Sequence, residues 1–229
     1  QNSEAFAFTD ILLGYDVYYE TAGALNGGKM VWLLAKIPSF YMVGDVVDPY
    51  LVFTNAHDGK AAIRAAITPI RVVCNNTLNL ALSKASRSWS VRHMGDIKSK
   101  MHEAQNTLGL ANQYMLNLGK TADELVLQKI NKTYIDKTVE FLFPIDDDDT
   151  KRRKQNQEEA REDIVWRLEN APDLANFRDT KWGLINAITD SNAHKTPARV
   201  TDSAVANAFI NIITGPSLVD KAYEYIQVR

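Results

Sequence analysis

The first third of the chain alternates apolar and polar residues with a period of two, which is typical of strands that bury one face of a sheet. Two runs of this kind, 17–25 and 30–37, flank an Asn-Gly-Gly turn that tolerates positive φ angles. Two more, 50–56 and 61–68, flank a His-Asp-Gly turn. The pattern therefore predicts two antiparallel hairpins, and a short helix that ends near Gly14 is expected before them.

The segment after the second hairpin contains signals for a short helix and for a further strand. Asn75, Asn76 and Thr77 precede leucines at every second position. We interpret them as the start of a short helix over 78–82, because asparagine and threonine are good N-caps. One further short strand is expected over 86–93.

A long amphipathic helix is predicted by apolar residues that recur at alternating steps of four and three over 97–118. Gly119 is expected to end this helix, because glycine is common just after a helix C-terminus. Thr121 and Glu124 have the spacing of a capping box, which predicts a second helix whose apolar face continues to Phe141.

Charged residues dominate the start of the next segment. Four aspartates and four basic residues over 146–154 predict a solvated turn that leads into a polar helix. This helix gains an apolar side only at Ile164, Trp166 and Leu168. Two or three further helices are predicted towards the end of the chain, around 181–193, 201–213 and 216–226.

Strands come first and helices follow, an order that predicts an α+β fold: antiparallel β-hairpins that form a sheet, followed by a mostly helical C-terminal half. We expect a mixed sheet–helix core domain over 1–143, a charged linker and polar helix start over 144–160, and a helical region over 161–229 that packs on the core. Because the chain begins at Gln1 within a patterned segment, we expect it to be a piece of a longer protein.

Composition excludes several classes of protein. Apolar residues make up 45% and charged residues 24% of the chain, as in an ordinary globular protein. The apolar runs are far shorter than the ~20 residues needed to cross a bilayer, and no secretory signal is recognisable, so no membrane contact is expected. The single cysteine, Cys74, cannot form an internal disulfide and fits a buried thiol in a reducing compartment. We therefore expect a cytoplasmic protein.

Charge is distributed unevenly along the chain. The net charge is −2, but residues 57–103 hold eight basic and three acidic side chains, whereas the flanking segments are acidic. A basic segment with interleaved aromatic residues is typical of proteins that bind single-stranded nucleic acid, since cations contact phosphates and aromatic faces stack on bases. The alternative is an ordinary solvated sheet face with Trp89 in the core. The candidate nucleic-acid-binding residues are Lys60, Arg64, Arg71, Asn75, Asn76, Lys84, Arg87, Trp89 and Arg92.

Motifs for nucleotide or metal chemistry do not occur in the sequence. The Gly-Gly turn lacks the spacing of a dinucleotide fingerprint, and there is no Walker motif, HExxH or GxSxG. The four histidines lack metal-ligand spacing, and the adjacent carboxylates of 146–149 lack the alternation of a Ca²⁺ loop. We therefore expect no cofactor, no metal and no catalytic residue. A metal-dependent nuclease that uses His57 and Asp58 stays open as an alternative.

Several longer segments carry a family resemblance. They are Tyr19–Gly23, Asn55–Gly59, Thr68–Leu78, Leu108–Leu110 and Trp182–Ala187. Together they resemble the phage/plasmid-like family filed as domain of unknown function 932. The resemblance brings no activity with it, but the association with phages and plasmids implies genes that handle DNA or act against host defences. The strand-hairpin-helix order is similar to the core of single-strand annealing recombinases, a likeness at the level of fold.

The hypothesis that follows is a cytoplasmic phage or plasmid protein of DNA metabolism that binds single-stranded DNA and promotes strand annealing in recombination as a homo-oligomer. Replication or recombination proteins of the host or phage would be further partners. The phosphate contacts are assigned to Arg64, Arg71, Lys84, Arg87 and Arg92, with Lys60 beside them at the hairpin tip. Trp89 or Tyr50 would stack on bases, and the backbone N–H groups at Asn75, Asn76 and Thr77 would meet a phosphate. The second alternative is an interaction protein of a mobile element that blocks a host defence.

Overall fold

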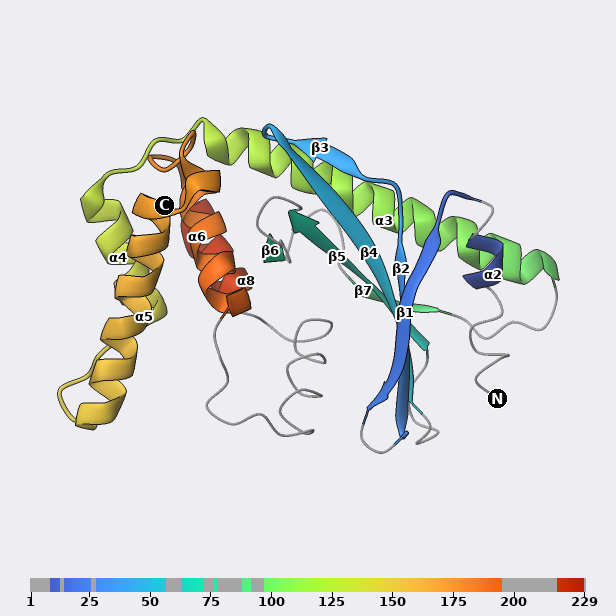
Figure 1. Ribbon diagram of the computed structural model, residues 1–229, viewed down its shortest axis with the longest axis horizontal. Helices are drawn as coiled ribbons and strands as arrows, with labels where there is room; N and C mark the ends of the chain where they lie inside the picture. The colour runs from blue at the N-terminus through green and yellow to red at the C-terminus, as the bar shows by residue number, and fades with distance from the viewer. Residues whose placement is uncertain are drawn as a thin grey trace.

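The protein is described by a computed structural model at residues 9–12, 15–25, 28–56, 63–71, 76–77, 88–91, 97–194 and 218–228. Its strands are β1 (Tyr18–Leu25), β2 (Met30–Lys36), β3 (Phe40–Met42), β4 (Asp45–Ala56), β5 (Ile63–Arg71), β6 (Asn76–Thr77) and β7 (Ser88–Val91). Its helices are α2 (Thr9–Leu12), α3 (Ile97–Val126), α4 (Lys132–Leu142), α5 (Lys151–Asn170), the 3₁₀ turn η2 (Pro172–Leu174), α6 (Lys181–His194) and α8 (Leu218–Val228). The strands precede the long helices, which confirms the α+β fold with a mostly helical C-terminal half (Figure 1).

The described strands form one seven-stranded antiparallel sheet in the order β1-β2-β4-β5-β6, with β3 paired to β4 and β7 paired to β5. Both predicted hairpins are confirmed, because β1 pairs with β2 and β4 pairs with β5. β4 is longer than expected, since its first residues, from Asp45, pair with β3. β1 begins only at Tyr18, because Asp16 has a positive φ of 57° that a strand does not accommodate.

α3 is a helix of 30 residues, ~45 Å long, that runs behind the sheet and continues to the C-terminal helices (Figure 1). Its buried residues, among them Ala111, Tyr114 and Met115, belong to the same apolar core as Leu51 and Ile67 of the sheet. α3 therefore links the sheet to the helical part of the molecule through one continuous core.

The prediction that Gly119 ends this helix is wrong, because α3 continues to Val126. Thr121 and Glu124, the predicted capping box, lie inside α3. The reason is packing: the apolar period continues at Ala122 and Leu125, which are buried in the core. Their burial outweighs the roughly 1 kcal/mol that glycine costs in a helix interior relative to alanine.

Of the residues expected to cap a short helix over 78–82, the structure describes Asn76 and Thr77. These two residues form β6 and pair with Arg71 and Ile70 of β5. The edge of β5 supplies backbone hydrogen-bonding partners, and a propensity argument based on local sequence does not include them. The leucine-rich segment 78–82 lies outside the described residues.

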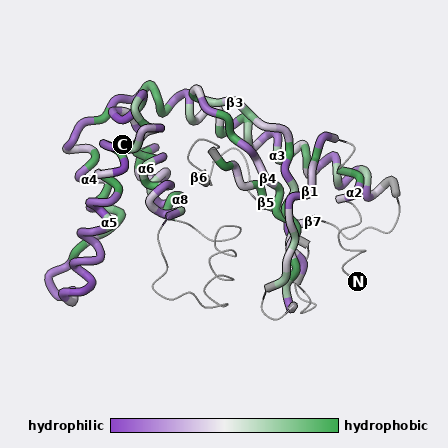
Figure 2. The backbone as a smooth tube through the Cα atoms, viewed as in Figure 1, coloured by the Kyte–Doolittle hydropathy of each residue, from purple (hydrophilic) through white to green (hydrophobic). Residues whose placement is uncertain are grey.

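The helices α4, α5, α6 and α8 gather at the C-terminal end of α3 (Figure 1). α6 is the most buried of them, with residues 181–189 all buried, whereas α5 is mostly hydrophilic (Figure 2). α5 buries Ile164 and Leu168, as predicted. Trp166 is instead 60% exposed, because residues two positions apart point to different sides of a helix.

Two of the helices predicted near the C-terminus are confirmed as α6 and α8, and 201–213 lies outside the described residues. α5 follows the charged turn, as expected, and Thr150 is its N-cap. α4 contacts α5 and α8, although it belongs to the predicted core domain. The division of the chain at residues 143 and 160 stays a prediction. Among the described helices, none combines the length and apolar character that a membrane crossing requires.

Candidate nucleic-acid interface

The sheet has two faces, and α3 packs on one of them. Ala35, Leu51, Phe53, Ala65 and Ile67 belong to the main core on that side. Because successive side chains of a strand alternate between faces, their neighbours point to the opposite side. We call this opposite surface the open face. Its described residues include Tyr18, Thr21, Gly23, Met30, Trp32, Leu34, Lys36, Asp48, Tyr50, Val52, Thr54, Arg64, Ala66, Thr68, Ile70, Ser88 and Ser90.

An apolar row runs across the middle of the open face. Leu34 is paired with Val52, and Val52 is paired with Ala66. Val52 and Ala66 form a small buried cluster against which Leu34 packs, and no residue of a described helix belongs to it. The open face therefore has its own small apolar centre, and Val52, Thr54, Ala66 and Thr68 on this face are buried.

On one side of this row, Trp32 is aligned with Gly23, Thr54 and Arg64 of the neighbouring strands. A Cβ atom added to Gly23 would lie 2.8 Å from the indole ring, so the ring lies directly over this glycine. Arg64 is exposed, as expected for the non-core face of the second hairpin. Its strand lies two positions away from that of Trp32, or about 10 Å. This row thus combines an aromatic surface with a cation.

On the other side of the apolar row, Lys36 is paired with Tyr50, and Tyr18 lies beyond Lys36 on β1. Tyr18 is 64% exposed, and Tyr50 is partly buried. Lys36 Nζ donates a hydrogen bond of 2.5 Å to Asp48, which raises the pKa of Lys36. Burial raises the pKa of Tyr50, so its hydroxyl is neutral at pH 7. This row provides two tyrosine rings around a lysine whose charge Asp48 offsets.

The predicted contact residues are distributed over both sides of the sheet. Arg64 and Tyr50 lie on the open face. Trp89 lies on the side of α3, where it packs against the core, and its Nε1 donates to Thr107 at 3.5 Å. This position agrees with the alternative that Trp89 belongs to the core. Arg71 and Asn76 are paired between β5 and β6. Lys60, Asn75, Lys84, Arg87 and Arg92 lie outside the described residues.

Sequence reasoning missed Trp32, Lys36 and Tyr18 as members of one surface. The strand that contains Trp32 and Lys36 is apolar at most of its positions, so it was interpreted only as part of a hairpin. Their alternation with Leu33 and Ala35 is visible in the sequence. Alternation does not reveal which face a helix covers, however, and it does not reveal which residues of other strands stand alongside.

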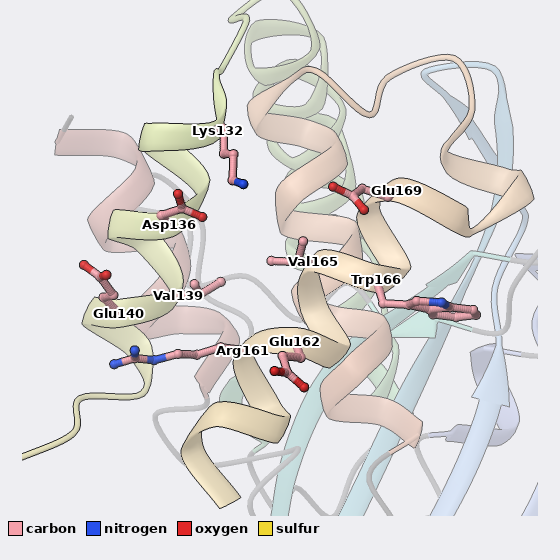
Figure 3. Close-up of a pocket in the computed structure, with 9 residues that line it drawn as sticks. All are labelled: Lys132, Asp136, Val139, Glu140, Arg161, Glu162, Val165, Trp166 and Glu169. Carbon is pink, nitrogen blue, oxygen red and sulfur yellow. The ribbon is translucent and has the colours of Figure 1, made fainter. Parts of the chain in front are cut away.

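A hollow of about 530 Å³ lies between α4 and α5 (Figure 3). It is lined by Lys132, Asp136, Val139, Glu140, Arg161, Glu162, Val165, Trp166 and Glu169. The guanidinium of Arg161 donates two hydrogen bonds, of 2.9 and 2.6 Å, to the Phe143 carbonyl at the end of α4. The ring of Trp166 points away from α4 (Figure 3). Because four carboxylates line the groove against two cations, it disfavours phosphate and is a poor site for nucleic acid.

A charged network joins α5 to α6. Arg167 donates from Nε to Asp163 at 2.9 Å and from Nη1 to Asp190 at 2.5 Å, and His194 Nδ1 lies 2.9 Å from Asp190. Burial would raise the pKa of Asp163, but hydrogen bonds from Arg167 and Ser191 hold it below its usual value. Since Arg167 is held between two carboxylates, this network connects two helices and is not available to a phosphate.

Within the part of the chain that the structure describes, no group of three or more His, Cys, Asp or Glu side chains is arranged to hold a metal ion. His57 and Asp58, on which the nuclease alternative depends, lie outside that part. The geometry therefore gives this alternative no further support.

The fold and this surface define the class: an α+β protein in which one long helix backs an antiparallel sheet, and the opposite sheet face carries aromatic and basic side chains. The chain belongs to the family described as Domain of unknown function (DUF932), which matches residues 1–209 and which the sequence motifs predicted. No curated protein and no solved structure matches the chain. Its function has therefore to be argued from the open face.

Proposed function

We propose that the protein binds single-stranded DNA across the open face and, as an oligomer, promotes the annealing of complementary strands. The observation that carries the proposal is the position of Trp32 and Tyr50 on this surface, each in a row with a basic residue, Arg64 or Lys36. Proteins that bind single strands combine aromatic faces, on which bases stack, with cations that contact the phosphates.

The spacing of the two rings suits an extended strand. Trp32 is paired with Thr54, which lies four residues along β4 from Tyr50, so the two rows are ~13 Å apart. Between the two rows lie Leu34, which is partly buried, and Val52, which is buried. A single strand laid along β4 therefore stacks one base at each aromatic residue and passes over the apolar row.

The surface favours unpaired bases over a duplex. Stacking on Trp32 or Tyr50 requires the face of a base, and in a duplex these faces are already covered by the neighbouring base pairs. Opening the duplex costs a few kcal/mol for each extruded base, whereas a single strand avoids most of this cost. We therefore expect a preference for single-stranded DNA that does not depend strongly on sequence.

Electrostatic attraction needs more positive charge than the described residues of the open face supply. Arg64 and Lys36 are its cations, and Asp48 offsets Lys36. In the proposal the remaining charge comes from residues that lie outside the described part: Lys60, Lys84, Arg87 and Arg92. In the sequence, they belong to the segments that adjoin β5 and β7.

The test is fluorescence anisotropy with labelled oligo-dT and with a duplex of equal length, over a salt series and in EDTA. We expect Trp32→Ala to weaken oligo-dT binding by about 5- to 150-fold, which corresponds to ~1–3 kcal/mol for one stacked base. Arg64→Ala should flatten the salt dependence by about one unit, since one phosphate contact is lost. Trp166→Ala and Arg152→Ala change exposed residues of the same types on α5 and should leave binding unchanged.

Circular dichroism of each variant separates lost binding from lost folding. Absence of oligo-dT binding by the parent at ~50 mM salt would rule out the proposal, because even non-specific phosphate contacts are detectable there. Equal losses in the Trp32→Ala and Trp166→Ala variants would rule out the open face as the site. Cleavage of the oligonucleotide on addition of Mg²⁺ would instead favour the nuclease alternative.

A further inference from the structure

β1 is an exposed edge of the sheet. In the described residues it pairs with β2 on one side and with nothing on the other. Residues Tyr18 to Ala22, and Ala24, are exposed to solvent. A strand of eight residues in this position presents a row of backbone N–H and C=O groups that can pair with another strand.

The edge lacks most of the features that keep sheet edges apart. Natural edge strands are commonly short, or carry lysine or proline, and such features block pairing between molecules. β1 has neither lysine nor proline. Its register irregularity between Tyr19 and Thr21, a feature that can also turn an edge away, lies before the regular segment and contains the one charged residue, Glu20. From Thr21 to Leu25 the strand pairs regularly with β2. This regular segment contains no charge that would oppose a second copy of itself.

Three exposed tyrosines stand at the start of the same edge. Tyr15, Tyr18 and Tyr19 are 42%, 64% and 39% exposed, and tyrosine is enriched in the buried centres of protein interfaces. Two of them are held in place: the Tyr19 hydroxyl contacts Thr9 at 2.8 Å, and the Tyr15 hydroxyl accepts from Gln105 at 3.2 Å. Ordered rings lose little conformational freedom when they are covered.

We propose that β1 pairs with β1 of a second copy of this chain, in antiparallel orientation and centred on Gly23, to form a symmetric dimer. Pairing centred on Gly23 includes the whole regular segment, because Thr21 then lies opposite Leu25 and Ala22 lies opposite Ala24 of the other copy. A strand paired with itself in this way places a two-fold axis perpendicular to the sheet. The same patch of both copies is used, so the assembly closes at two subunits.

The tyrosines supply area that the strand edge alone does not. Specific interfaces bury roughly 1,600 Å² in total, which is more than five paired residues on each side provide. Tyr18 and Tyr19 lie before the regular segment, and their exposed rings add area to the interface. Because the interface is modest in size, the dimer forms reversibly and its population depends on concentration.

The dimer has a consequence for the open face. With the two-fold axis perpendicular to the sheet, the open faces of the two copies lie on the same side and form one longer surface. The dimer itself does not depend on the proposed DNA binding, since it is inferred from the edge of β1 and the tyrosines at its start. A variant that loses dimer formation but keeps DNA binding, or the reverse, is therefore measurable.

The first test is sedimentation velocity of the whole chain over a range of concentrations, with charged pairs placed on the edge. In the proposed register, Ala22→Lys/Ala24→Lys brings lysine opposite lysine and should give monomers at concentrations at which the parent is dimeric. Ala22→Glu/Ala24→Lys brings opposite charges together and should retain the dimer. Asn112→Lys/Leu116→Lys, at exposed positions of α3, is the control for added charge and should behave as the parent.

The second test examines the register by disulfide formation in a Cys74→Ser background. Residues directly opposite in an antiparallel pair have Cα atoms ~4.5–5.5 Å apart, which a disulfide can span. Ala22→Cys and Ala24→Cys should each give little covalent dimer alone, and a mixture of the two should give a cross-linked pair. A parent that stays monomeric at all concentrations overturns the proposal, and so does an oligomer that none of the edge variants alters.

Discussion

At the scale of single residues, Lys181 is the clearest departure from an ordinary surface position. Its side chain is only 8% exposed, Nζ donates to the Ile226 carbonyl of α8 at 2.9 Å, and it lies 5.6 Å from the centre of the Tyr134 ring. Burial lowers the pKa of Lys181 from its usual 10.5. The lysine therefore connects α6, α8 and α4 at the cost of keeping an ammonium group away from water.

Stability should rise with pH through the titration of this lysine. Between the lowered pKa and 10.5 the unfolded chain binds more protons at this position than the folded chain, so the free energy of unfolding increases with pH, by at most ~1.4 kcal/mol per unit. We expect the stability of the parent relative to Lys181→Met to increase as the pH approaches 10.5, as measured by urea denaturation. Tyr19 and Tyr223 have raised pKa values, but the parent and the Lys181→Met variant both contain these tyrosines. Their contribution therefore cancels in the difference in stability. A constant or falling difference would contradict the expectation.

At the scale of elements, two helical glycines have opposite roles. In α6, a Cβ atom on Gly183 would lie 2.1 Å from the Phe177 carbonyl oxygen, so only glycine permits this close approach of the helix to the preceding backbone. The amide of Gly183 also donates to Thr180 Oγ1 at 3.1 Å, which fixes the start of the helix. In α3, a Cβ atom on Gly119 would meet nothing within 4 Å.

Alanine at these two positions should therefore change stability in opposite directions. Gly119→Ala removes the cost of glycine inside a helix without a clash and should stabilise the protein by up to ~1 kcal/mol. Gly183→Ala forces α6 away from its support and should destabilise it by ~1–3 kcal/mol or more. Urea denaturation of both variants measures the difference. A neutral Gly183→Ala variant would show that α6 can shift at little cost.

At the scale of the whole molecule, one apolar core extends from the sheet to the C-terminal helices. It includes Phe53 and Ile67 of the sheet, Leu118 of α3, Ile185 of α6 and Tyr223 of α8. α3 contributes to it on both sides, since it packs on the sheet and contacts α6. A continuous core of this kind couples the folding of its parts.

We therefore expect a single unfolding transition for the sheet and the helices together. Far-UV circular dichroism reports mainly on the helices, and the fluorescence of Trp32 and Trp89 reports on the sheet. With Trp166 and Trp182 changed to phenylalanine to leave only those two signals, the two transitions should coincide in urea. Separate midpoints would instead support independent units divided near the predicted boundaries at residues 143 and 160.

The candidate site could be predicted only in part. The sequence placed Arg64 on the outer side of a hairpin and named Tyr50 for stacking, and both lie on the open face. It also named Trp89, which packs against the core on the side of α3, and overlooked Trp32, which lies over Gly23. Charge and residue type identify candidates along the chain, but neither reveals on which side of a sheet a side chain lies.

The order of the elements, the two hairpins and most of the helices are predictable from the sequence alone, because they depend on periods of two and of three to four residues within each segment. Packing between distant segments decided where α3 ends, that Asn76 and Thr77 pair with β5, and which face of the sheet α3 covers. The physical reason is that a local period defines an apolar face but not its partner. Only packing between distant segments determines which faces are buried, and a strand edge such as β1 becomes apparent only when the sheet is assembled.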